Sequence, residues 1–313
     1  MSQDEPKKAL YRQFVEDIIN GGRYELIPEI FDPGYLDHSA PPGAPGGLGG
    51  VEAVFRMFRG GFPDVHFNIQ SMLAEGDKVA TRVVGSGTHN GAFMGIAPTG
   101  KKATWGSHGI FRVANGRIVE HWGQPDILAL LAQIGGIPPS ANVGPPADTS
   151  GLPAHPDVPP ADPHDPAMLA EHKRLTTWAH AVALSTGDVS LARTYIAADY
   201  LDHPPARPYV ISITGPESLI DDVREFRTAF PNLHAECVDM VAEGNQVCSR
   251  GIWTGTHTGD FFGIPPTGKS MEVQGMNFFR FADGQFVERY GTWDVLSMMQ
   301  QLGLMPGPAG PGH

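Results

Sequence analysis

The most constraining feature of this 313-residue sequence is that it contains two copies of one pattern. Four segments of the first half recur in the second half in the same order. The offset is 165 residues for the first segment and 168 for the others, so one loop near 204–214 is three residues longer. A repeat of this length predicts two domains of one fold. The matched segments are FDPGYLDHSAPP (31–42) with AADYLDHPPA (197–206), FPDVHF (62–67) with FPNLHA (230–235), GTHNGAFMGIAPTGK (87–101) with GTHTGDFFGIPPTGK (255–269), and FRVANGRIVEHWGQPD (111–126) with FRFADGQFVERYGTWD (279–294).

The repeat also sets the domain boundaries. We expect a first domain over residues 1–136, a linker over 137–166, a second domain over 167–305 and a loose tail over 306–313. The linker carries ten of the 29 prolines of the chain and little that could form a core. Such a composition is typical of an extended, semi-rigid spacer.

Within each copy the pattern changes from helical to extended. Leu10, Phe14 and Ile18 recur every four residues, as on the buried face of a helix. Leu175, Trp178 and Val182, which are three and four residues apart, predict the same kind of helix in the second copy. From the FPD or FPN motif onward, alternating and β-rich segments with glycine turns predict strands, and a short apolar helix closes each copy. Helices followed by a meander predict an α+β domain, in which helices cover one face of a curved antiparallel sheet.

The segment GIPPTGKS at 263–270 fits the nucleotide-binding pattern G-x-x-x-x-G-K-[ST]. A phosphate-binding loop opens a helix, whose amide groups hold the phosphates, but the residues after Lys269 read as a strand. Pro265 and Pro266 remove two amide donors from the loop, and the first copy has Lys102 where the pattern requires Ser or Thr. We therefore interpret the segment as a turn between strands and not as a nucleotide site.

Composition limits the partners. The formal charge of −12 would repel polyphosphates, so no nucleic-acid role is expected. No apolar run approaches the ~18 residues needed to span a bilayer, and the first residues lack an apolar signal core, so we expect a cytoplasmic protein without a membrane segment. The two cysteines, Cys237 and Cys248, are expected to stay reduced.

The motifs YLDH, FPD, GTHxGxFxGIxPTGK and FRxxxGxxVExxxxxxD together resemble the SnoaL-like polyketide cyclase (ester cyclase) group of the NTF2-like superfamily. The resemblance covers both copies. It implies an α+β cone, in which a curved sheet and three helices enclose an apolar cavity. It also implies a cofactor-free lyase or isomerase of secondary metabolism, which closes the rings of polyketide esters by aldol chemistry. Because members of the family commonly dimerise through their sheets, the two copies are expected to pair within one chain, with homo-oligomerisation as a further option.

One position departs from the family in both copies. The family usually has Asp two residues after the His of an E-H-W-D motif, whereas this chain reads EHWG (120–123) and ERYG (288–291). Enolate chemistry in a dry pocket requires a base and a donor that stabilises an oxyanion, so other side chains become candidates. The candidate catalytic residues are Asp37, His38, His121, Asp126, Asp202, His203, Asn277, Arg289 and Asp294.

Each catalytic candidate has a structural alternative. Each Asp-His pair of the YLDH motifs could act as a base or could consist of a turn-forming Asp and a packed His. Asp126 and Asp294 directly precede the final helices, where they are acids at the cavity rim or N-caps.

The face on which the last strand presents its polar residues depends on the hairpin register. A two-residue loop would place His108 on the face of His121. A three-residue loop with a glycine bulge would place Gly109 opposite His121 and Asn277 opposite Arg289, and the family precedent favours this second register.

Six further residues are candidates for substrate binding, with strand capping, an arginine–carboxylate bridge to the last strand or core filling as the alternatives. They are His89, His108, Trp178, Arg250, Trp253 and His257. No metal site is expected, because the histidine spacings match no metal-binding motif.

Three functions remain open at this point. The first is a cofactor-independent cyclase or isomerase acting on a hydrophobic, polyketide-like small molecule. The second is an epoxide hydrolase or epoxide-opening cyclase, which the superfamily also contains. The third is a binding protein without catalysis, which the glycines in place of the family Asp would explain. A buried Asp with an Arg partner and a water favours epoxide opening, whereas a lone Asp/His near an apolar slot favours enolisation.

Overall fold

The computed structural model describes residues 4–40, 44–137, 159–206 and 213–305. Most of the expected linker and all of the expected tail lie outside the described residues. The chain divides into two compact units, which we call unit 1 and unit 2 and describe separately. No helix in the described ranges is long and apolar enough to cross a membrane.

Unit 1 consists of helices and one five-stranded sheet. Its elements are α1 (Glu5–Gln13), the π-helical turn η1 (Phe14–Asn20), the 3-10 turn η2 (Tyr24–Leu26), α2 (Ile27–Ile30), β1 (Phe31–Asp37), α3 (Gly47–Gly61), β2 (His66–Glu75), β3 (Lys78–Thr88), β4 (Lys102–Ala114), β5 (Arg117–Pro125) and α4 (Ile127–Ile134).

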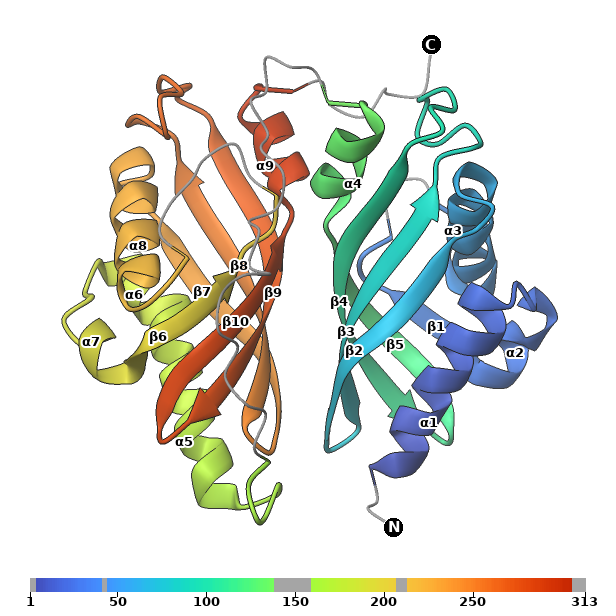
Figure 1. Cartoon of the computed structure of the whole chain (residues 1–313), viewed down its shortest axis with the longest axis horizontal. Helices are drawn as coiled ribbons and strands as arrows, with labels where there is room; N and C mark the ends of the chain where they lie inside the picture. Colours follow the sequence, from blue (N-terminus) through green and yellow to red (C-terminus); the bar gives the residue numbers. More distant parts are fainter. Residues whose placement is uncertain (1–3, 41–43, 138–158, 207–212, 306–313) are drawn as a thin grey trace. The chain divides into compact units, whose positions relative to one another are not determined.

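Unit 2 repeats this order, as the duplication predicts. Its elements are α5 (Pro166–Thr177), the π-helical turn η4 (Trp178–Val182), α6 (Ala183–Thr186), α7 (Ala192–Tyr195), β6 (Ile196–His203), α8 (Glu217–Ala229), β7 (His234–Glu243), β8 (Gln246–Thr256), β9 (Ser270–Ala282), β10 (Gln285–Trp293) and α9 (Val295–Gln301). In each unit the long helices lie against one face of a curved sheet, so the expected α+β cone is confirmed (Figure 1).

The sheets are mixed rather than wholly antiparallel. The strand order is β1-β5-β4-β3-β2 in unit 1 and β6-β10-β9-β8-β7 in unit 2. Four strands of each sheet form the expected antiparallel meander, but β1 pairs with β5 in parallel, and β6 pairs with β10 in the same way. The expectation of an antiparallel sheet is wrong at this edge. The chain passes through helix α3 or α8 after the first strand, so no hairpin fixes the direction of that strand.

The first helix of each unit packs an apolar stripe on the sheet. Phe14 is 4% exposed and Ile18 is fully buried, as the four-residue spacing predicts. In unit 2 the stripe deviates, since Val182 is 41% exposed. Val182 ends the π-helical turn η4, where the wider turn rotates the following residues away from the expected face.

The GIPPTGKS segment is a turn that leads directly into strand β9 at Ser270, which confirms that it does not open a helix. Gly268 and its counterpart Gly100 both have a φ of 69°, which glycine adopts without strain. His257 holds the turn, because its Nδ1 lies 3.1 Å from Thr267 Oγ1 and its carbonyl accepts from the Gly268 amide at 2.9 Å. His89 and Thr99 repeat the first contact in unit 1 at 3.0 Å.

Candidate functional site in the second unit

The interior of unit 1 is filled by a cluster of aromatic rings. The ring of Phe14 lies 4.9 Å from that of Phe31, 5.4 Å from that of Phe55 and 6.2 Å from that of Phe111, measured between centroids. All three contacts are close to perpendicular, the edge-to-face geometry that aromatic pairs favour. These rings occupy the space between the first helix, α3 and the sheet.

Unit 2 carries smaller residues at three of these four positions. The repeat offsets of 165 and 168 match Phe14 with Ala179, Phe31 with Ile196, Phe55 with Val223 and Phe111 with Phe279. Ala179, Ile196 and Phe279 line a pocket in unit 2. The loss of three rings therefore explains why the interior of unit 2 is open where that of unit 1 is packed.

A tryptophan has changed strands between the two units. In unit 1, Gly85 of β3 pairs with Trp105 of β4, and a Cβ at Gly85 would meet the indole at 2.6 Å. In unit 2 the equivalent pair is Trp253 of β8 with Val273 of β9. Each pair holds one large and one small residue, so the packed volume is similar. The change places Trp253 in the pocket wall, where it also packs in the core.

Arg289, which lines the pocket, forms a buried ion pair with Asp202 of the edge strand β6. Arg289 Nε of β10 lies 2.8 Å from Asp202 Oδ1 of β6, and Arg289 Nη2 lies 3.3 Å from Asp202 Oδ2. Asp202 is fully buried and also accepts a hydrogen bond from Ser218 Oγ at 3.0 Å. Burial disfavours the charged guanidinium, but the negative charge of Asp202 more than offsets this and raises the pKa of Arg289.

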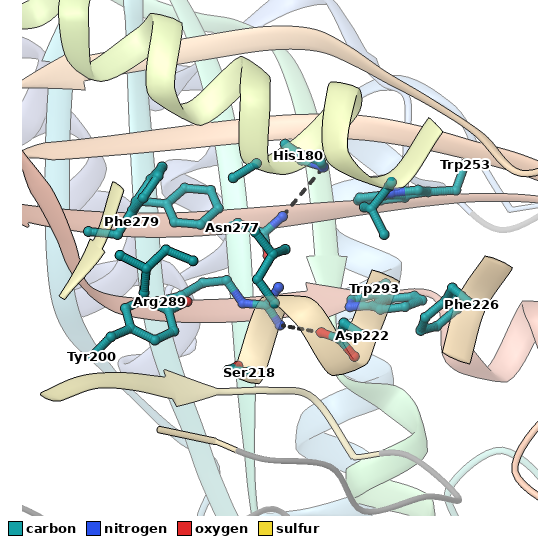
Figure 2. A pocket seen from close by; sticks show the side chains of 15 residues that line it. His180, Tyr200, Ser218, Asp222, Phe226, Trp253, Asn277, Phe279, Arg289 and Trp293 are labelled. Atoms are coloured by element: carbon teal, nitrogen blue, oxygen red, sulfur yellow. Dashed lines mark hydrogen bonds and ion pairs between the residues drawn. The ribbon is translucent and has the colours of Figure 1, made fainter. Parts of the chain in front are cut away.

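A second carboxylate faces the same guanidinium from the helix side. Asp222 of α8 is 4% exposed and lines the pocket, and its Oδ2 lies 3.9 Å from Arg289 Nη2. Asp202 is not among the lining residues. Figure 2 shows Arg289 directed toward Asp222. The arrangement is therefore a guanidinium between a structural carboxylate and one that faces the pocket.

A neutral histidine stands on the other side of the pocket. His180 Nδ1 lies 2.6 Å from Ser249 Oγ, and Asn277 Nδ2 lies 3.4 Å from His180 Nε2 (Figure 2). The imidazole stacks on Trp253 with a centroid distance of 4.7 Å. Burial, with the nearby charge of Arg289, lowers the pKa of His180 to about 3. A neutral imidazole that accepts from Asn277 at Nε2 carries its proton at Nδ1 and donates it to Ser249.

Unit 1 keeps only part of this polar arrangement. Asp37 Oδ1 lies 3.3 Å from His121 Nδ1 and accepts from the amide and hydroxyl of Ser39 at 2.9 and 2.6 Å. Burial opposes ionisation of Asp37, but hydrogen bonds from His121 and Ser39 lower its pKa to about 2. The His121 ring stacks on Phe111 at 4.2 Å. Val54 stands where unit 2 has Asp222, so unit 1 lacks the second carboxylate.

The Asp and His of each YLDH motif do not form a pair. Successive residues of a strand point to opposite faces of the sheet, so His38 and His203 lie away from Asp37 and Asp202. His203 Nε2 instead contacts Glu288 Oε1 at 3.0 Å, and His38 Nε2 lies 3.6 Å from Glu120 Oε1. The hypothesis of a base made from sequence neighbours is wrong. The actual partners of the two aspartates are His121 and Arg289.

Neither expected hairpin register is correct. Gly109 pairs with Gly123, and Asn277 pairs with Gly291, because a two-residue turn is followed by a bulge in the last strand. The expected direct pairing of Asn277 with Arg289 is therefore wrong by two residues. Since two residues is one full period of a strand, both side chains still lie on the pocket face.

The remaining candidates lie outside the pocket lining of unit 2 or in unit 1. Asp294 caps α9 by accepting from the Ser297 amide at 2.9 Å, and Asp126 accepts from the Ala129 amide at the same distance at the start of α4. Both aspartates therefore cap the N-termini of these helices, which was the structural alternative to a role as acids. His257 holds a turn, as described above.

Three further candidates for substrate binding have other surroundings. Trp178 packs edge-on against Tyr195 at 5.2 Å in the core. Arg250 lies opposite Asp239 of β7, not beside the last strand. His108 alternates with Gly109 on β4 and so points to the sheet face away from the unit 1 interior. The described residues contain no group of three or more His, Cys, Asp or Glu side chains that could hold a metal.

Neither Asp222 nor His180 was expected in the pocket from the sequence, although signals for both exist. Asp222 replaces Val54 on the apolar stripe of its helix, and His180 replaces Val15 on the first helix. A polar residue at a core-facing position in only one of the two copies indicates a functional site, because an unpaired polar group is costly to bury. The signal becomes visible once the two copies are aligned.

Comparisons with known proteins match each unit separately. A family model described as SnoaL-like polyketide cyclase matches residues 9–134 and residues 173–302. The aklanonic acid methyl ester cyclase DnrD of Streptomyces peucetius is 28% identical over 122 residues, which are 39% of this chain and 83% of that protein.

Two solved structures are also similar to this chain. IdmH of Streptomyces antibioticus, assigned as a polyketide cyclase, is 34% identical, with 42% of this chain and 99% of that chain covered and a TM-score of 0.38. TsrD of Streptomyces laurentii is 25% identical, with 44% of this chain and 99% of that chain covered and a TM-score of 0.40.

Proposed function

Because the chain belongs to the SnoaL-like polyketide cyclase family, we propose that its second unit closes a ring in a hydrophobic, polyketide-like small molecule by cofactor-independent acid–base chemistry. The observation that carries this proposal is the pocket of unit 2, where Asp222, Arg289 and Asn277 lie together among apolar walls. The aromatic cluster at the matching place in unit 1 supports a division of labour, in which unit 1 is structural.

The proposed reaction begins with proton transfer to Asp222. Its carboxylate takes a proton from a carbon next to a substrate carbonyl, and the electron pair of the C–H bond moves to form an enolate. Arg289 stabilises the enolate oxygen, since a preorganised cation in a dry site acts strongly on developing negative charge. Asp202, which accepts a hydrogen bond from Ser218, keeps the guanidinium in place and neutralises its charge.

Ring closure follows within the same molecule. The enolate carbon attacks a second carbonyl carbon, a C–C bond forms, and the oxygen of that carbonyl takes the proton back from Asp222. The product is an isomer of the substrate, so the balance of atoms and electrons needs no cofactor. Phe226, Phe279 and Trp293 line the pocket and limit the access of water to the enolate.

Asp222→Asn is the direct test, with the methyl ester of aklanonic acid as the first substrate because DnrD is named for it. Loss of substrate and appearance of a cyclised product of equal mass are followed by liquid chromatography and mass spectrometry. We expect Asp222→Asn to lower kcat by about 10²–10⁴-fold, the usual contribution of a general base.

Asp221→Asn is the matched control, because this neighbouring carboxylate pairs with Arg224 on the surface of the same helix. It should retain the wild-type rate. Equal rates for wild type and Asp222→Asn would contradict the proposed base.

The second candidate function is epoxide opening, which the Asp202–Arg289–Asp222 arrangement favours. In this reaction Asp222 accepts a proton from water, the hydroxide attacks an epoxide carbon, and the opened oxygen, stabilised by Arg289, takes the proton back from Asp222. Asp202 holds the guanidinium in place. Incubation with limonene oxide in ¹⁸O-labelled water distinguishes this reaction. A labelled diol from the wild type, absent with Asp222→Asn, would favour hydrolysis over ring closure.

A further inference from the structure

Asn277 presents a buried hydrogen-bond acceptor to the pocket. The residue is 4% exposed, and its Oδ1 has no hydrogen-bond partner among the described residues. Buried polar groups in folded proteins are nearly always paired, so an unpaired acceptor in a pocket wall points to a ligand that supplies the donor. The matching residue of unit 1 is Gly109, which has no such group.

The orientation of the Asn277 amide is fixed by its neighbours. Its Nδ2 donates to His180 Nε2, and His180 is held by Ser249 and by stacking on Trp253. Because Nδ2 faces His180, Oδ1 faces Gly291 and Arg289. Figure 2 shows Asn277 between His180 and Arg289. His180 is thus a positioning residue for this acceptor.

Gly291 keeps the approach to this acceptor open. A Cβ at Gly291 would lie 2.9 Å from Asn277 Oδ1 and 3.5 Å from Arg289 Nη2. Any larger residue at position 291 would therefore stand in front of both groups. In unit 1 the same place, at Gly123, is covered by the ring of His121, whose Cε1 would lie 2.6 Å from a Cβ there.

An acceptor and a donor side by side select for one kind of ligand group. Asn277 Oδ1 needs a hydrogen to accept, whereas the Arg289 guanidinium only donates. A hydroxyl satisfies both at once, because it donates its hydrogen and accepts at its oxygen. A carbonyl, an ether or an ionised phenolate has no hydrogen to offer.

We propose that Asn277 Oδ1 and Arg289, with Gly291 leaving access, form a subsite for a phenol or enol hydroxyl group of the ligand. The assignment of this group to a substrate rests on the proposed function, since it makes the preferred substrate a hydroxylated polyketide-like molecule. Binding at the subsite does not depend on turnover.

The test measures binding of three probes to the full chain by titration calorimetry. Phenol carries the hydroxyl, anisole carries the oxygen without its hydrogen, and toluene lacks both. We expect phenol to bind the wild type about tenfold more tightly than either of the others, the effect of one good buried hydrogen bond. Equal binding of phenol and anisole, or no phenol binding at millimolar concentration, would overturn the proposal.

Two variants assign the preference to the named atoms. Asn277→Leu removes the acceptor at similar volume, and Gly291→Ala blocks its approach while keeping Asn277. Each should reduce the preference for phenol over toluene to less than about twofold. Asn68→Leu, at an exposed position of β2, is the matched control and should keep the wild-type preference.

Gly291→Ala keeps the Asn277 side chain but places a Cβ 2.9 Å from its Oδ1. A phenol preference that survives in this variant would refute the subsite even if Asn277→Leu fails to fold. The outcome is separable from the proposed function. A phenol preference without ring closure would leave the subsite standing and remove the cyclase proposal. Ring closure that requires Asp222 without any phenol preference would do the reverse.

Discussion

Acidification below about pH 6.5 is expected to destabilise unit 2 through His180. This pH range lies above the one in which the carboxylates of unit 2 are protonated. Burial, followed by the charge of Arg289, lowers the pKa of His180 from 6.5 to about 3. As the pH falls below 6.5, the histidine of the unfolded chain takes up a proton, whereas the folded one stays neutral down to about pH 3. The unfolded state therefore binds more protons throughout this window, and stability decreases as the pH falls.

The expected loss of folding stability follows from the width of the pH interval over which it is measured. Between pH 6.5 and about pH 5, ~1.5 pKa units at ~1.36 kcal/mol per unit correspond to a loss of about 2 kcal/mol. Glu288, with its pKa held at about 2 against an ordinary 4.5, adds a loss of the same sign mainly below about pH 4.5. His172 and His257, whose pKa values burial also lowers, add loss within the window. The informative quantity is therefore the difference between the wild type and His180→Gln.

Hydrogen exchange followed by mass spectrometry can measure this difference for unit 2 alone. Peptides from β8 and β9 report the free energy of opening at about pH 7 and about pH 5, after correction for intrinsic exchange. His180→Gln should lose about 2 kcal/mol less than the wild type over this range. His234→Gln, which removes an exposed histidine of the same unit, is the matched control. An equal loss in wild type and His180→Gln, or protonation of His180 above pH 5 in a nuclear magnetic resonance titration, would refute the reasoning.

Three further predictions concern packing and charge. Phe14→Ala should destabilise unit 1 by about 3–5 kcal/mol, because the buried ring fills its interior; a loss under about 1 kcal/mol in hydrogen exchange of β4 peptides would contradict this. Asp202→Ala should destabilise unit 2 by about 3–5 kcal/mol in urea unfolding, since Arg289 would stay buried without its counter-charge; a midpoint equal to that of the wild type would count against the ion pair. Trp253→Gly should cost about 3–5 kcal/mol alone, and adding Val273→Trp should recover part of it, as a double-mutant cycle of urea midpoints would show; strict additivity would contradict the exchange of volume between strands.

The fold was predictable from the sequence because its signals are local or repeated. The four-residue spacing of the first helix, the alternating strands and the Pro-Thr-Gly turns depend on residues close in the chain. The turn at Gly268 follows from the φ that its position requires, which few residues other than glycine adopt. The direction of β1 was not predictable in this way, because no hairpin connects it to β5.

The candidate site was predictable only in part. Asp202, Asn277 and Arg289 were among the candidates from the sequence, and the structure brings them to one face of the unit 2 sheet. Their true partners could not be derived, because a bulge after the turn shifts the register by a distance that the sequence does not encode locally. His180 and Asp222 come from helices that only the packing of the unit places over that face.

The sequence by itself thus determined that the chain contains two copies of one α+β fold and that the family Asp is glycine in both. Only the tertiary structure decided which copy has an open interior. That choice depends on pairs of residues far apart in the chain, such as Phe14 against Phe111, or Ala179 against Phe279. Whether such residues fill a space or leave a pocket depends on their combined volume across helix and sheet, and no single segment of the sequence specifies it.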